Sequence, residues 1–343
     1  MEISAILQIW YDQNKRALPW RETSDPYLIW LSEVILQQTR VAQGMDYYLR
    51  FAKRFPTVAD LAAASEDEVL KLWQGLGYYS RARNLHAAAL QVMNEYEGQF
   101  PSDYGSLLRL KGVGPYTAAA VSSFAGGEKM AVVDGNVYRV LARLFDLDTP
   151  IDTPTGQRAF QDLANQLLDP AHPAKHNQAV MEFGALFCTP QSPSCAECPL
   201  AAGCLALANG HVESRPVKAG KTKIRERHLR YYLLKYKDCL WVHRRGKGDI
   251  WQGLWEYYVE EDSLQTSAGS QNSSIIQPPA FTLRHQLTHQ LLTCDFHIVQ
   301  LDQVPDHLPS DYECITWEEW QKKAVPKPIF EANARFSAFF EDK

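Results

Sequence analysis

Four cysteines within one short segment constrain this chain more than any other feature of its sequence. Cys188, Cys195, Cys198 and Cys204 form a C-x6-C-x2-C-x5-C array. Four thiolates in one loop can hold a tetrahedral zinc ion or a cubane iron–sulfur cluster, and the single C-x2-C favours iron–sulfur because zinc sites usually pair two knuckles across a longer span. With all four ligands supplied by protein, no open iron is left for a substrate, so we expect a structural or DNA-positioning role rather than a catalytic one.

Length and composition suit two soluble domains. The chain has 343 residues, more than one ordinary domain needs. It lacks both the run of roughly 18 apolar residues that a membrane span requires and a signal peptide, so a cytoplasmic location is expected. Cys239, Cys294 and Cys314 are scattered, which together with the clustered four favours a metal site in a reducing compartment over disulfides. With a net charge of −5, any nucleic-acid binding must come from local sites.

The expected organisation is an all-α domain over residues 1–206, a linker over 207–223 and a domain rich in strands over 224–343. Helical spacing and start signals predict helices over 27–38, 80–96, 115–124, 136–145, 156–168 and 176–187. Ser65 begins a predicted capping box. Alternating, aromatic-rich runs predict strands over 229–236, 239–243 and 254–260, so the second domain is α/β or α+β. A Ser/Gln-rich run over 263–277 predicts a mobile loop.

Two glycines one residue apart precede a predicted helix in LKGVGPYTAAAV. Gly112 and Gly114 allow a tight turn whose backbone N–H groups, with the helix N-terminus, can receive a phosphate. Alone this pattern is weak evidence, because many helix connections need glycine for geometry. Downstream, in VVDGNVYRVLARL, Asp134 stands at the start of the next helix, where the commoner role of an aspartate is a plain N-cap.

The hairpin, the downstream acid and the cysteine array, in this order, resemble the helix-hairpin-helix/Gly-Pro-Asp superfamily of DNA glycosylases over residues 20–205. The combination is far more specific than any part. The resemblance implies a two-lobed all-α fold with a DNA groove and a pocket for a flipped base. It also implies a 4Fe-4S cluster on the four clustered cysteines, and contacts to the DNA backbone from Lys111, Gly112, Val113, Gly114 and Thr117.

Within that superfamily the chain resembles the adenine DNA glycosylases more than the endonuclease III-like enzymes. The latter carry a Schiff-base lysine just after the hairpin, where this chain has Tyr116, so a monofunctional enzyme is expected. Segments PWR at 19–21, IWLSEVILQQT at 29–39, GLGYYSRARNL at 75–85 and HNQAVMEFG at 176–184 match the adenine enzymes. The resemblance implies hydrolysis of the N-glycosidic bond of adenine mispaired with 8-oxoguanine or guanine, leaving an abasic site. The alternative is an endonuclease III-like enzyme acting on damaged pyrimidines.

Glu33 can be judged from its neighbours. Its helix is apolar nearly all round, so the carboxyl should be buried, and burial without a cation raises a carboxyl pKa and keeps the group protonated near neutral pH. The alternative is a buried glutamate paired with an arginine, and the residues alone do not decide between the two. The resemblance makes Glu33 the general acid.

The resemblance also implies the other roles in the site. Asp134 stabilises the positive sugar, and Tyr116 and Asn136 support the carboxylate pair. Trp20, Arg21 and Glu182 line the adenine pocket, although Trp20 could be core and Arg21 a surface ion pair. The residues expected to fill the gap left by the flipped base and to touch 8-oxoguanine are Gln38, Thr39, Leu76 and Tyr78. Leu76 and Tyr78 would otherwise be read as packing.

The second domain resembles an α+β Nudix fold without the acidic motif that binds magnesium, so pyrophosphate hydrolysis is not expected. By resemblance it recognises 8-oxoguanine through a Phe-Ser-His loop, for which this chain has Leu287, Thr288 and His289. Thr288 keeps the hydroxyl of the serine in that triplet, whereas Leu287 lacks the aromatic face of the phenylalanine.

The expected partner is double-stranded DNA with A:8-oxoguanine or A:G mismatches, bound by a monomer that is nucleoid-associated if bacterial. Repair or replication proteins are candidate partners through the linker. An alternative outside the enzymes is a DNA-binding module that has lost catalysis and keeps the cluster as a structural element. The intact Glu33 and Asp134 argue against it.

Overall fold

The chain forms two compact units. The computed structural model describes residues 2–220, 224–261, 278–304, 308–337 and 340, so the predicted loop at 263–277 lies outside the described residues. The first unit comprises residues 1–63 and 84–221, and the second unit comprises residues 64–83 and 222–343. Residues 64–83 therefore pack with the C-terminal part of the chain, although the predicted domain boundaries assign them to the helical domain.

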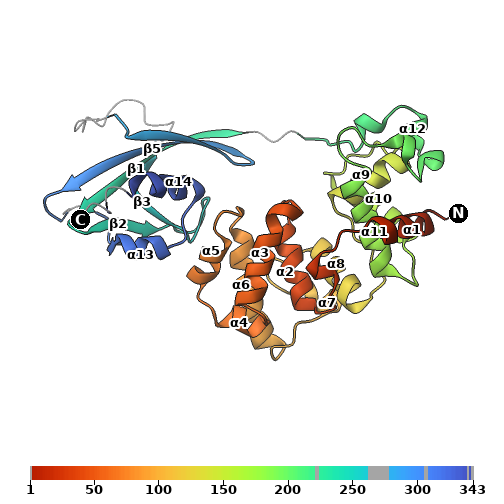
Figure 1. Cartoon of the computed structure of the whole chain (residues 1–343), viewed down its shortest axis with the longest axis horizontal. Coiled ribbons are helices and arrows are strands. Elements are labelled where there is room, and N and C mark those ends of the chain that lie inside the picture. The colour runs from red at the N-terminus through yellow and green to blue at the C-terminus, as the bar shows by residue number, and fades with distance from the viewer. Residues whose placement is uncertain (1, 221–223, 262–277, 305–307, 338–339, 341–343) are drawn as a thin grey trace. The chain divides into compact units, whose positions relative to one another are not determined.

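The first unit is built from helices (Figure 1). Its elements are α1 (Ile3–Asn14), η1 (Pro19–Arg21), α2 (Pro26–Leu36), α3 (Val41–Arg54), α4 (Val58–Ala63), most of α6 (Ser80–Glu95), α7 (Tyr104–Leu107), α8 (Pro115–Gly126), α9 (Gly135–Leu144), α10 (Pro154–Leu167), α11 (Pro173–Leu186), η2 (Cys195–Glu197), η3 (Ala201–Gly203), α12 (Leu205–Ala208) and η4 (Val212–Ser214). All six predicted helices are present, with no end displaced by more than three residues.

Local side-chain caps explain where the helices near the site begin. The Asp25 carboxylate accepts from the Tyr27 backbone N–H at the start of α2. The Asp134 carboxylate accepts from two backbone N–H groups at the start of α9. Such caps satisfy donors that the first turn leaves unpaired. Ser65 likewise caps α5 (Glu66–Trp73) in the second unit by accepting from Glu68 N.

The packing of the first unit buries α2 and α11. Helix α2 contacts α3 and α8 and buries Trp30, Leu31 and Ile35 almost completely. Helix α11 contacts α1, α8 and α9. Gly184 permits the close approach to α9, because a Cβ there would lie 2.7 Å from Cβ of Asn136. This contact places the two helices that carry Glu182 and Asn136 against each other.

The second unit contains a mixed six-stranded sheet in the order β4-β5-β1-β3-β2-β6. Strands β1 and β5 are parallel, and the other pairs are antiparallel. Its elements are α5, β1 (Arg225–Tyr236), β2 (Cys239–Arg244), β3 (Trp255–Glu261), β4 (Phe281–Gln286), β5 (Gln290–Leu301), β6 (Tyr312–Thr316), α13 (Trp317–Lys322) and α14 (Lys327–Phe336). The three predicted strands are confirmed as β1, β2 and β3. Helices α13 and α14 pack through Trp320 and Phe336 on the sheet core.

The scattered cysteines correct one expectation. Cys239 of β2 and Cys314 of β6 form a disulfide between residues separated by 75 positions in sequence. The two strands are antiparallel neighbours, which brings together cysteines that the sequence separates. Cys294 is free and buried.

The described part of the predicted linker is held to the first unit. Val217 O accepts from Ile151 N, and the Asp152 carboxylate accepts from Ala219 N and Gly220 N. Within the described residues, no helix is both long and apolar enough to pass through a lipid bilayer.

Candidate active site

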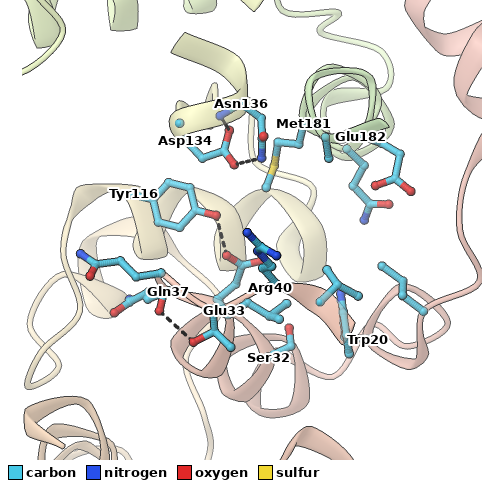
Figure 2. A pocket seen from close by; sticks show the side chains of 18 of the residues that line it. Trp20, Ser32, Glu33, Gln37, Arg40, Tyr116, Asp134, Asn136, Met181 and Glu182 are labelled. Atoms are coloured by element: carbon cyan, nitrogen blue, oxygen red, sulfur yellow. Dashed lines mark hydrogen bonds between the residues drawn. The ribbon is translucent and has the colours of Figure 1, made fainter. Parts of the chain in front are cut away.

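An open cavity of about 860 Å³ in the first unit collects most of the predicted catalytic and substrate-binding residues (Figure 2). Helices α2, α8, α9 and α11 and the short η1 turn contribute to its wall. The predicted residues that line it are Trp20, Arg21, Glu33, Gln38, Thr39, Tyr116, Asp134, Asn136 and Glu182. Segments far apart in sequence therefore converge on one cavity.

Glu33 is buried, with only 8% of its surface exposed. Its Oε2 accepts a 2.8 Å hydrogen bond from the Tyr116 hydroxyl, so its partner is a phenol and not an arginine. Burial raises the pKa of Glu33 to about 7, partly opposed by the Tyr116 bond, while the neighbouring Asp134 charge raises it further. A carboxyl with this pKa holds its proton near neutral pH and can donate it.

Asp134 is held by the first turn of α9. Its Oδ1 accepts from the backbone N–H groups of Asn136 and Val137 at 2.9 and 2.8 Å, and its Oδ2 accepts from Nδ2 of Asn136 at 2.7 Å. Burial raises the pKa of Asp134, and these three N–H donors oppose the rise by favouring the charged form. The two carboxyls thus lie in one cavity with different hydrogen-bond environments (Figure 2).

Glu182 is clamped by two arginines. Arg16 donates through Nε and Nη2 at 2.8 and 2.6 Å, and Arg21 through Nη1 and Nη2 at 3.0 and 2.8 Å. Burial disfavours the charge, but the hydrogen bonds from Arg16 and Arg21 outweigh it and lower the pKa of Glu182 to about 2. Arg21 is thus part of a buried cluster rather than a surface pair. Arg16 is not predicted from the sequence, where its local signal is its place five residues before Arg21.

The remaining lining residues differ in exposure. Trp20 is buried and meets Tyr48 edge to face, with 5.1 Å between the ring centroids. Gln38 is exposed and has a positive φ of 55°, and Thr39 is half-buried beside it. Gln37, which the sequence analysis did not select, donates to the Thr117 hydroxyl at 3.2 Å.

The glycine hairpin leaves open space where a phosphate is expected. Gly112 has a positive φ of 75°, and a Cβ added at Gly112 would lie 2.5 Å from Cβ of Asn84. At Gly114 a Cβ would meet nothing within 4 Å. Lys111 is exposed, whereas Val113 and Thr117 are buried.

The four clustered cysteines lie in one loop, and Cys188, Cys198 and Cys204 pack against the core of α1, α9, α10 and α11. Burial raises the pKa of Cys195 and Cys198, and the neighbouring cysteines raise it further. A raised pKa favours the neutral thiol, so bound metal would have to supply the positive charge that holds these cysteines as thiolate ligands. Among the described residues, no three Cys, His, Asp or Glu side chains converge as ligands of a single metal ion.

Two arginines of α9 bind the cysteine loop, and one of them, Arg139, connects it to the site. Arg143 donates to Thr189 O at 2.7 Å and to Cys188 Sγ at 3.4 Å. Arg139 donates to Cys188 O at 2.7 Å and to Asn136 Oδ1 at 2.8 Å. Because Asn136 in turn donates to Asp134, a chain of polar contacts runs from the cysteine loop to the cavity. Neither Arg139 nor Arg143 is predicted as a site residue from the sequence.

The other predicted residues line a separate cavity of about 490 Å³ in the second unit. Leu287, Thr288 and His289 form the turn between β4 and β5, with Thr288 and His289 exposed. The Tyr78 hydroxyl lies 2.5 Å from the Thr288 hydroxyl, within hydrogen-bond distance. Leu76 is buried and only 6% exposed, so this structure shows it in a packing position.

Three family models match the chain. Residues 31–166 match the HhH-GPD superfamily of base excision DNA repair proteins, residues 188–204 the iron-sulfur binding domain of endonuclease III, and residues 230–333 the NUDIX domain. The second match contains all four clustered cysteines.

Relatives over nearly the whole chain identify the family. The mouse adenine DNA glycosylase is 34% identical, over 92% of this chain and 74% of that protein. The chain belongs to the adenine DNA glycosylase family. The family member from Buchnera aphidicola subsp. Schizaphis graminum is also 34% identical, over 77% of this chain and 76% of its own. The human member is 44% identical, but the match covers only 41% of that protein.

Solved structures agree with the fold of the glycosylase part. A thermostable thymine-DNA glycosylase matches with a TM-score of 0.56 and 30% identity, covering 60% of this chain and 95% of that one. An endonuclease III in a DNA complex matches with a TM-score of 0.53 and 24% identity, over 61% of this chain and 96% of that one. At this identity, the match to endonuclease III supports a shared fold and nothing about function.

Proposed function

We propose that this chain hydrolyses the N-glycosidic bond of adenine paired with 8-oxoguanine or guanine in duplex DNA and leaves an abasic site. The observation that carries the proposal is the pair of carboxyls in one cavity, Glu33 with a pKa of about 7 and Asp134 bound by three N–H donors. Two carboxyls in different environments are what glycosidic hydrolysis requires.

Glu33 is the general acid. Adenine is a poor leaving group until its ring is protonated, and a buried carboxyl with a pKa near 7 is both protonated at neutral pH and acidic enough to give up its proton. Tyr116 orients this carboxyl through its hydroxyl.

Asp134 stabilises the sugar as the bond to adenine breaks. The departing base leaves positive charge on the deoxyribose, which a fixed carboxylate offsets. Asn136 holds Asp134 through its backbone and side-chain N–H groups, so the carboxylate needs little reorganisation. Water then completes hydrolysis and leaves the abasic site.

The remaining wall of the cavity receives the flipped adenine. Trp20, Arg21 and Glu182 contact the base, and Arg16 keeps Glu182 ionised as an acceptor for an amino group. Gln38 and Thr39 lie at the cavity rim to fill the gap in the duplex.

The cysteine loop and the hairpin bind and orient DNA. Cys188, Cys195, Cys198 and Cys204 hold a 4Fe-4S cluster, which supplies a structural centre for the loop. The hairpin receives a DNA phosphate at Lys111, Gly112 and Gly114, where the backbone is exposed. Backbone contacts of this kind position the duplex without reading its sequence.

The second unit reads the base opposite adenine. Thr288 and His289 at the β4–β5 turn and Leu76 and Tyr78 in the Gly75–Tyr79 turn contact 8-oxoguanine. The support is that all four line one cavity and that Tyr78 reaches Thr288. The enzyme acts as a monomer in the cytoplasm, and candidate repair or replication partners bind through residues 207–223.

Single-turnover cleavage of duplexes with adenine opposite 8-oxoguanine, guanine or thymine tests the proposal. We expect release of adenine fastest opposite 8-oxoguanine, and an abasic product that breaks only after alkali treatment. Excision of thymine glycol with little release of adenine would instead support an endonuclease III-like enzyme. DNA binding without excision of either base would support a module that has lost catalysis.

A further inference from the structure

Residues 64–83 lie within the match to the helical repair superfamily, yet they belong to the second unit. This segment contains α5 and the Gly75–Tyr79 turn that follows it. Gly75, Gly77 and Tyr78 all have positive φ, at 97°, 78° and 49°. A tyrosine with positive φ is strained, so surrounding contacts must hold the turn in this conformation.

Lys71 of α5 makes two of these contacts with one charged group. Its ammonium donates to Gln321 O at 2.7 Å and to Lys323 O at 2.8 Å, at the C-terminal end of α13. Carbonyl groups at a helix end lack helical partners, and a charged donor satisfies them well. Burial lowers the pKa of Lys71, because the charged ammonium loses part of its hydration at this position.

Neighbouring residues bind the same end of α13. The Gln74 side-chain oxygen accepts from Val325 N at 3.2 Å, and the Tyr79 hydroxyl donates to Val325 O at 3.5 Å. On the far side of the turn, Arg83 donates to Gln252 O at 2.6 Å. The Gly75–Tyr79 turn is therefore attached to the second unit on both of its sides.

We propose that Lys71 is a positioning residue for recognition of the base opposite adenine, because it fixes the Gly75–Tyr79 turn on α13 and so keeps Tyr78 beside Thr288. The inference rests on the proposed function, which makes Tyr78 and Thr288 the contacts to 8-oxoguanine. Lys71 touches neither the adenine nor the reacting sugar. It acts through the turn.

The test compares Lys71→Met, which keeps the aliphatic stem, with Lys71→Arg, which keeps the charge and the donors. Lys322→Met is the matched control, because Lys322 carries the same charge on α13 but is 69% exposed and pairs with Glu318 of its own helix. The readouts are single-turnover rates opposite 8-oxoguanine and opposite guanine, and hydrogen exchange of the backbone at residues 72–80. The second readout involves no DNA.

In Lys71→Met, which removes both hydrogen bonds of the ammonium, we expect faster exchange in the turn and a loss of at least roughly tenfold in the preference for 8-oxoguanine, since one charged hydrogen bond alone accounts for about tenfold. The rate opposite guanine should stay within about twofold by the same reasoning, because the catalytic cavity is untouched. Lys71→Arg should recover most of the preference, and Lys322→Met should match the native enzyme.

Unchanged exchange in Lys71→Met would refute the anchoring. Faster exchange with an intact preference, or an equal loss on both substrates, would refute the link to specificity. If the native enzyme releases adenine but shows no preference for 8-oxoguanine, the proposed recognition of the opposite base by the second unit fails, and the specificity role of Lys71 fails with it. The exchange data still decide whether Lys71 anchors the turn. If the native enzyme releases no adenine, the proposed function itself fails.

Discussion

The phenol of Tyr116 donates a 2.8 Å hydrogen bond to Oε2 of Glu33. Burial raises the pKa of this carboxyl to about 7, and the hydrogen bond limits the rise because it stabilises the ionised form. Tyr116 is thus placed to adjust how readily Glu33 gives up its proton.

Tyr116→Phe should raise the pKa of Glu33 further, since the ionised carboxylate loses its donor. In a single-turnover pH profile, the decline in adenine release at high pH should move upward by about one pH unit, the equivalent of one hydrogen bond to a charged group. The midpoint of the decline is the relevant measure, because the maximal rate also depends on how Glu33 is oriented. A midpoint that stays or moves to lower pH would contradict this account.

Glu33→Gln should abolish excision while leaving DNA affinity nearly native. The amide fills the same space but has no acidic proton, and loss of a general acid costs about 10²- to 10⁴-fold in rate. Single-turnover cleavage and gel-shift titration of the same A:8-oxoguanine duplex would measure the two effects. Native-rate release by this variant would remove Glu33 from its assigned role.

Glu33 should also make stability depend on pH. Its pKa is about 7 in the folded chain against a reference value of 4.5, so the folded state binds the proton more tightly than the unfolded state. Stability should fall as pH rises between these values, with the full cost, at most about 3 kcal/mol, present above the upper one. Glu33→Gln should therefore raise the unfolding midpoint in calorimetry at pH 8 and leave it nearly unchanged at pH 4. Equal effects at both pH values would indicate a packing effect instead.

Cys198→Ser should reduce folding yield and cluster content more than intrinsic chemistry. The change removes one of four expected ligands from a loop whose ordering depends on the bound group. Iron and sulfide content and visible absorption per folded protein, compared with Cys294→Ser as a control outside the array, would measure it. Full cluster absorption in the Cys198→Ser variant would show that another residue completes the site.

Tyr116→Lys should gain a covalent complex with DNA that borohydride traps. A lysine beside two carboxyls can attack the sugar if part of it is neutral, and the resulting Schiff base leads to strand cleavage. Adenine release should fall, because the phenol is lost and a cation near Asp134 weakens its effect on the sugar. The native enzyme should trap little. Efficient trapping by the native enzyme would overturn monofunctional chemistry and direct the search to another lysine.

The parts of this molecule that the sequence predicts are those determined locally. Helices α2 and α9 begin where Asp25 and Asp134 cap them, because a cap acts within three residues. The buried carboxyl of Glu33 follows from the apolar residues around it on α2. Tyr116 can be predicted as a site residue because it stands just after the hairpin, where endonuclease III-like enzymes carry the Schiff-base lysine.

What the sequence analysis missed depends on residues that are distant in the chain. Arg16 meets Glu182 across 166 positions, and no local pattern indicates that two arginines share this carboxylate. Cys239 and Cys314 pair only because β2 and β6 are neighbours in the sheet. Strands β4, β5 and β6 are not predicted, although β5 carries a local signal, the alternation of buried Leu292, Cys294 and Phe296 with less buried residues.

The packing of residues 64–83 with the C-terminal strands means that the second unit cannot be removed or exchanged at a single cut. The chain enters that unit, returns to the helical one and enters again after residue 221. Truncation near the linker would take away the partners of Lys71 and Gln74 and uncover Leu70 beside Gly253. A chimera with the C-terminal domain of another family member must therefore also carry that member's version of residues 64–83. The two separate segments have to be exchanged together, because each packs on the other.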